Sequence, residues 1–110
     1  MDTNVLLTML KAGLEIITDY MDAEAKQSKE QELMFYILTA IQNIEREGVD
    51  LIPDAVDDQM LVVMYAMWLY DKRKTTGSKY TSYYIQNMPR MLRWTLNNRL
   101  MQQKIREAEA

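Results

Sequence analysis

Residues 60–70 read Met-Leu-Val-Val-Met-Tyr-Ala-Met-Trp-Leu-Tyr, an unbroken apolar and aromatic run in a chain otherwise rich in charged side chains. Acidic residues precede the run and basic residues follow it, the order that a helix dipole favours. We therefore expect one helix from about Asp54 to about Lys74. The run spans only roughly 16 Å at about 1.5 Å per residue, against ~30 Å for a bilayer core. It predicts a long apolar helix at the centre of the protein, covered on every side, and no membrane span.

The composition limits both the architecture and the chemistry. With 110 residues, 48% hydrophobic and 26% charged, the chain is expected to form a single globular domain over residues 1–110. It contains no cysteine and no histidine, which removes thiolate chemistry, the usual general base and the commonest metal ligand. We therefore expect no enzyme activity and no cofactor. The N-terminal stretch lacks the pattern of a secretory signal, so we expect a soluble intracellular protein.

Three further segments have helical periodicity. Apolar residues recur every three or four positions over residues 3–17, which predicts a first helix there. A second helix is expected to begin near Ser28 and to end at Gly48 in a left-handed cap. A last helix should open at Pro89 and run to about Arg106, with frayed residues after it. Together these segments predict an all-α, compact four-helix domain whose central helix contacts the other three.

Large adaptable side chains are divided between the expected core and an expected interface. The methionines of the central run are assigned to the core together with Val63, namely Met60, Met64 and Met67. The segment Thr75–Asn87 has no periodic apolar stripe, so we expect an arm or loop that becomes ordered on assembly. Because aromatic residues are enriched at interfaces, four of them are candidate partner contacts: Tyr80, Tyr83, Tyr84 and Trp94.

Charge is distributed unevenly along the chain. Residues 1–71 contain four basic and fourteen acidic side chains, whereas residues 72–110 contain nine basic and two acidic ones. Solvated helix surfaces alone would explain a moderate imbalance. For an imbalance this large, two readings remain open: the basic part meets nucleic acid, or it meets the acidic face of another protein, including a second copy of this chain.

The order of these features resembles the small all-α phage head-to-tail connector proteins, also called head completion or neck proteins. Three segments carry the resemblance: Leu10-Lys11-Ala12-Gly13-Leu14, Leu69-Tyr70-Asp71-Lys72-Arg73, and Met88-Pro89-Arg90-Met91-Leu92 leading to Arg99. The polar stretch Ile17–Glu32 is longer than in the usual pattern.

The resemblance implies a structural role in the virion neck, after synthesis in the host cytoplasm. About a dozen copies would form a ring beneath the portal protein and seal the DNA-filled head. The ring would present a platform to the next neck or tail protein. DNA would pass through its channel without sequence-specific binding, and no membrane would be involved.

Charge could set how copies recognise one another. If acidic helices of one copy face the basic last helix of the next, the same contact repeats around a circle and closes a ring. Met91 and Trp94 would then supply most of the affinity, because exposed ion pairs contribute at most about 1 kcal/mol each. The residues expected to carry the charge contact are Arg90, Arg93 and Arg99 on the basic side and Glu30, Glu32, Glu45 and Glu47 on the acidic side.

Two rival functions have weaker signals. Five acidic residues could gather around a divalent cation, as in helical nucleotide pyrophosphohydrolases: Asp54, Asp57, Asp58, Glu45 and Glu47. Helix capping explains the aspartates better. Nucleic-acid binding is the stronger rival, although the acidic two thirds of the chain would weaken any positive field. Its candidate residues, with the tyrosines between them, are Lys72, Arg73, Lys74, Lys79, Arg90, Arg93 and Arg99.

Overall fold

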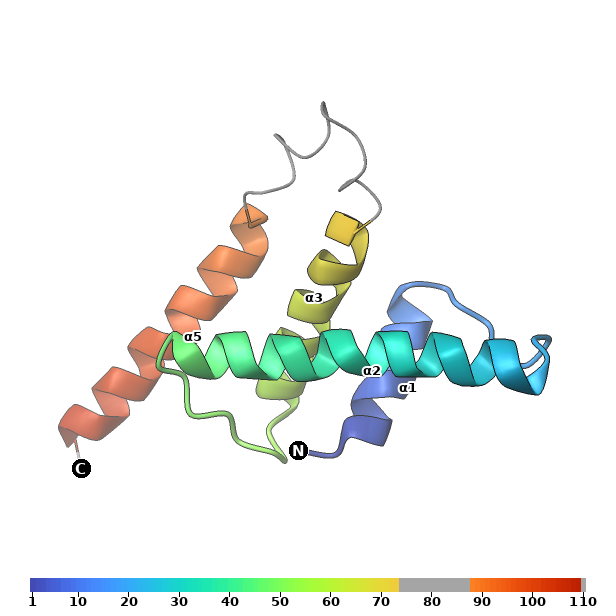
Figure 1. Ribbon diagram of the computed structural model, residues 1–110. Coiled ribbons are helices and arrows are strands. Elements are labelled where there is room, and N and C mark those ends of the chain that lie inside the picture. Colours follow the sequence, from blue (N-terminus) through green and yellow to red (C-terminus); the bar gives the residue numbers. More distant parts are fainter. Residues whose placement is uncertain (74–87, 110) are drawn as a thin grey trace.

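The computed structural model describes residues 1–73 and 88–109 of the chain, and these residues form helices with no strand (Figure 1). Helix α3 contacts each of the other helices, and α1 also packs on α2. The prediction of an all-α, four-helix fold is confirmed. The helices are α1 (Thr3–Gly13), α2 (Ala23–Arg46), α3 (Val56–Arg73) and α5 (Arg90–Glu109). The expectations for Thr75–Asn87 lie outside the described residues.

Helix α2 begins earlier than predicted and ends where predicted. The carboxylate of Asp22 accepts the Ala25 N–H at 2.7 Å, so the helix starts at Ala23 instead of near Ser28. A good cap upstream allows Ser28 to lie inside the helix. At the other end Gly48 has φ 102°, and its N–H donates to the Glu45 carbonyl at 3.0 Å. This left-handed cap confirms the predicted end of the helix.

Helix α1 is shorter than the predicted 3–17. The chain leaves the helix after Gly13, and Glu15 adopts a left-handed conformation with φ 58°. Its end lies close against α3, because a Cβ on Gly13 would lie 3.0 Å from the Met67 sulfur. The apolar periodicity continued past the helix because Ile16 still packs on the core from the loop that follows.

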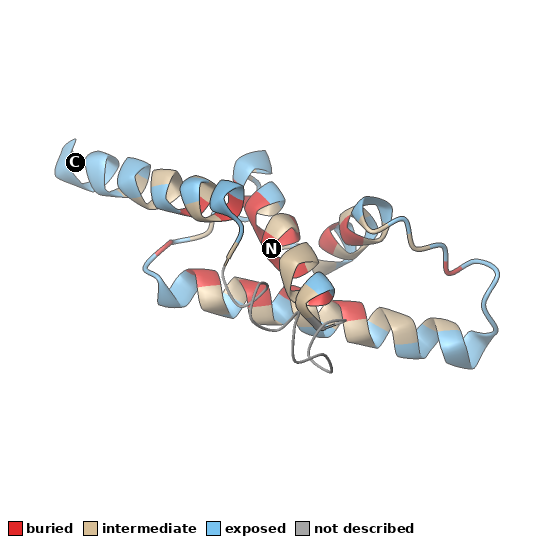
Figure 2. Cartoon of the chain, turned by 90° about the horizontal axis from the view of Figure 1, so that it is seen from above, coloured by how far each residue is buried: buried red, intermediate tan, exposed pale blue. Residues whose placement is uncertain are grey.

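The core lies where α3 meets the other helices (Figure 2). Helix α3 begins at Val56, close to the expected start near Asp54, but the expectation that it is covered on every side is wrong. Met60, assigned to the core, is 45% exposed, since α1, α2 and α5 leave one side of the helix open. The fully buried apolar residues come from all four helices and include Leu6, Leu10, Leu33, Ile37, Ile44, Leu61, Val62, Ala66 and Leu96.

Helix α5 extends further than predicted. The Pro89 carbonyl accepts the Arg93 N–H at 3.0 Å in its first turn, and the helix continues to Glu109 instead of ending near Arg106. Its last turns lie beyond the other helices (Figure 1). Within the described ranges, no helix is long and apolar enough to cross a bilayer.

We predict that Gly48→Ala lowers the free energy of unfolding by about 1–2 kcal/mol, the cost of a left-handed conformation for a residue with a Cβ. Space is not the cause, because the nearest atom to an added Cβ, from Leu100, would be 3.6 Å away. Urea denaturation measures the change. The exposed Gln42→Ala in α2 is the control, with an expected change within about 0.5 kcal/mol. Equal stability of Gly48→Ala and the wild type would contradict the role of this cap.

Candidate protein-interaction surface

A buried ion pair holds α5 against the start of α3. The Asp58 side chain is 2% exposed and accepts from Arg99 Nε at 2.6 Å and from Arg99 Nη2 at 3.0 Å. It also accepts the Ile52 N–H at 2.7 Å, while Arg99 Nη2 donates to the Asp50 carbonyl at 2.7 Å. One guanidinium thus joins α5 to both α3 and the loop that precedes α3.

Other side chains of α5 reinforce the same joint. Gln103, one turn beyond Arg99, accepts the Asp50 N–H at 2.7 Å and donates to the Gly48 carbonyl at 2.8 Å. Nearer the start of the helix, Arg93 Nη1 lies 2.7 Å from a Glu47 carboxylate oxygen. These contacts follow one side of α5 and satisfy backbone groups of the connection between α2 and α3.

The environment of Asp58 keeps it ionised. Burial by itself raises the pKa of a carboxyl group. At Asp58 the hydrogen bonds from Arg99 and from the Ile52 N–H, with the positive charge of Arg99, outweigh burial and hold the pKa below its ordinary value. The same hydrogen bond raises the pKa of Arg99. The pair is therefore fully charged at neutral pH.

The opposite side of α5 is apolar and uncovered. Met91, Trp94, Met101 and Ile105 are each between 52% and 65% exposed, although Leu92 and Leu96 on the inner side are buried. The helix thus carries two apolar sides. Among residues 1–73 and 88–109, the inner side packs in the core, and we call the outer side the outer stripe of α5.

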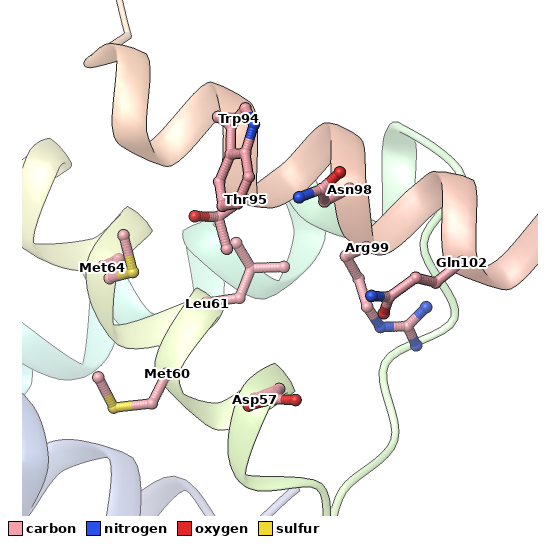
Figure 3. A pocket seen from close by; sticks show the side chains of 9 residues that line it. All are labelled: Asp57, Met60, Leu61, Met64, Trp94, Thr95, Asn98, Arg99 and Gln102. Atoms are coloured by element: carbon pink, nitrogen blue, oxygen red, sulfur yellow. The ribbon is translucent and has the colours of Figure 1, made fainter.

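An open hollow of about 300 Å³ adjoins this stripe, between α3 and α5 (Figure 3). Helix α3 contributes Met60, Leu61 and Met64, and α5 contributes Trp94 and Asn98 to its wall. Methionine side chains are flexible and polarisable, so such a wall adapts to apolar groups of different shape. The hollow is suited to holding a side chain of a partner, and Asp57 and Thr95 add polar groups to its wall.

The predicted interface residues lie in different environments. Arg90 and Trp94 are exposed on α5, as an interface requires, whereas Tyr80, Tyr83 and Tyr84 lie outside the described residues. Arg99 points inward to Asp58, and its side chain is only 11% exposed. Its expected contact with a neighbouring copy is therefore corrected: the fold already uses this guanidinium.

The expected acidic partners are also largely engaged within the chain. Glu47 pairs with Arg93, Glu30 lies 3.0 Å from Lys11, and Glu32 lies 3.6 Å from Lys29. The proposed contact between acidic and basic patches of neighbouring copies loses most of its charges to these pairs. Glu45 remains exposed, and no ion pair of Glu45 is found in residues 1–73 and 88–109.

The role of Asp58 was missed by sequence reasoning, which treated it as one of three helix-start acids. The spacing of residues in the last helix could have indicated that Arg99 is buried and needs such a partner. Arg99 follows Leu92 and Leu96 at intervals of seven and three residues, so it belongs to the same buried stripe. A buried arginine requires a carboxylate partner.

The candidate carboxylates do not form a metal site in the described part of the chain. No group of three or more acidic side chains there is arranged to hold an ion. Asp58 is instead bound to Arg99, and Glu47 to Arg93.

Comparison with protein-family models, with curated proteins and with solved structures finds no match to the chain.

We predict that Asp58→Ala lowers the free energy of unfolding by about 3–5 kcal/mol, because it leaves the Arg99 charge buried without a partner. The exposed neighbour variant Asp57→Ala should cost less than about 1 kcal/mol. Chemical denaturation of both variants measures the difference. The double variant Asp58→Leu/Arg99→Met should recover much of the loss, and no recovery would show that the pair is not the cause.

The same pair predicts a pH dependence. The pKa of Asp58 is lowered on folding, so its stabilisation is complete above the unfolded-state value of about 3.9. It is lost as the pH falls through the folded-state pKa. Below about pH 4 the wild type should therefore lose stability more steeply than Asp58→Asn. Parallel slopes for the two proteins in acid would contradict this assignment.

Proposed function

We propose that this chain is the structural subunit of a phage head-to-tail connector, built into a ring of about a dozen copies between the portal protein and the next neck or tail protein. The observation that carries the proposal is the outer stripe of α5. Soluble monomers rarely leave several large apolar side chains on one side of a helix uncovered, and such surfaces are typical of protein contacts. A structural subunit needs surfaces of this kind and no catalytic group.

Rigid support of the stripe fits this role. Arg99 and Gln103 hold the middle of α5 to the loop before α3, so the helix presents its outer residues in a fixed orientation. Preorganised surfaces lose less entropy on association than flexible ones. The hollow beside Trp94 and Met64 adds a place where a partner's side chain can insert.

Nucleic-acid binding is less well supported. Three of the basic residues that such binding needs are engaged within the chain: Arg93 with Glu47, Arg99 with Asp58, and Lys72, whose Nζ lies 5.1 Å from the Trp68 ring centre. The two ion pairs reduce the positive charge available to phosphates, and the ring contact holds Lys72 in place. Duplex DNA binding tighter than micromolar at physiological salt, weakened by added salt, would favour this rival.

We predict that the purified chain joins its cognate portal protein in a complex with many copies of each. Native mass spectrometry of the chain alone, of the portal alone and of the mixture measures the stoichiometry. A chain that stays monomeric in the mixture, with no mass added to the portal, would refute the connector function.

Trp94→Ala should weaken this assembly at least about tenfold, because exposed aromatic residues are frequent binding hot spots. Glu107→Ala is the matched control, since Glu107 is an exposed residue of the same helix that points away from the outer stripe. Both variants should retain the helical content of the wild type.

A further inference from the structure

The outer side of α5 has the spacing of a coiled-coil seam. Its residues follow one another at alternating intervals of three and four, which is the a and d pattern of a heptad repeat. The inner side, with Leu92 and Leu96, belongs to the fold. The members of the seam, in order, are Met91, Trp94, Asn98, Met101, Ile105 and Ala108.

We propose that this seam packs against the same seam of a second copy of the chain, with the two α5 helices parallel and in register. The inference rests on the proposed function and deepens it by naming one contact between copies. Because the seam meets itself, it joins copies in pairs, and a second contact joins the pairs into the ring. Space for the partner exists, because every residue from Lys104 to Glu109 is exposed and this part of α5 lies beyond the other helices (Figure 2).

The flanking charges select the parallel orientation. One edge of the seam carries Arg90, Asn97 and Lys104, and the other carries Thr95, Gln102 and Glu109. In a parallel pair the two different edges face each other, so Lys104 lies opposite Glu109 of the second copy, and Asn97 lies opposite its Gln102. In an antiparallel pair like edges meet, and the basic edge would lie along a second basic edge.

Asn98 selects the register. A single asparagine at an a position fixes the alignment of a parallel pair, because the two amides hydrogen-bond across the seam. In an antiparallel pair centred on the same seam, Asn98 would face Met101 of the second copy. Met101 would then cover the Asn98 amide. Its side chain cannot supply the hydrogen bonds that the amide loses when it is removed from water.

Parallel pairing also suits a connector. Copies that point the same way give an assembly with two different ends, and a connector must bind one protein at one end and another protein at the other. An antiparallel pair would present the same surface at both ends.

Single cysteines test the geometry, because the chain has none of its own. In the parallel, in-register pair, the two thiols of the Ile105→Cys variant, one from each copy, lie opposite each other and close enough to form a disulfide. Glu107→Cys is the control, an exposed position two residues away that points to the other side of the helix. Mild oxidation of Ile105→Cys should give covalent dimers roughly tenfold faster than oxidation of Glu107→Cys, since pairing raises the local thiol concentration.

Three outcomes would overturn the proposal. The first is an equal oxidation rate for Ile105→Cys and Glu107→Cys. The second is a mixed disulfide between Trp94→Cys and Ile105→Cys that forms in preference to the disulfide between two copies of Ile105→Cys. The third is an Ile105→Asp variant that associates as strongly as the wild type in a sedimentation series. Portal binding without cross-linking at residue 105 would refute this contact and leave the connector function standing. Cross-linking at 105 in a chain that never joins the portal would support the contact and refute that function.

Discussion

The position of α5 depends on the ion pair between Asp58 and Arg99. Apart from it and its neighbouring hydrogen bonds, α5 reaches the core mainly through Leu92 and Leu96, in its first two turns. An apolar contact of that size would hold the helix at one end but would not fix its rotation. The paired guanidinium, which also binds the Asp50 carbonyl, fixes the rotation because its hydrogen bonds are directional.

Fixing the rotation of α5 decides which residues face solvent. With Arg99 turned inward, the residues on the other side of the helix turn outward, including Trp94 and Met101. The energetic cost of burying two charges is offset by their pairing and by the backbone groups that they satisfy. The ion pair therefore matters less for net stability than for presenting one particular face of the helix, which is the face that we propose binds a second copy.

Much of the fold could be predicted from the sequence, because helix ends and apolar periodicity are local signals. The cap at Gly48 followed from one glycine in a suitable place. The start of α2 was missed because Asp22 and Ser28 are both acceptable caps, and residue type alone does not decide between them. Met60 was misplaced because an apolar run does not reveal which part of its helix the described neighbours α1, α2 and α5 leave exposed. Of the site, Trp94 was identified from its residue type, but the partner of Arg99 required the fold.

Part of the charge separation along the chain is used inside the fold. Acidic residues of the first part pair with basic residues of the last part inside one molecule, as Glu47 does with Arg93 and Asp58 with Arg99. These two ion pairs, between oppositely charged parts of the sequence, help to align α5 with the loop that precedes α3. Because these pairs are closed within the chain, they cannot also hold neighbouring copies together. The association that we propose would then rest on apolar contact, with charge left to select orientation at the edges of the seam.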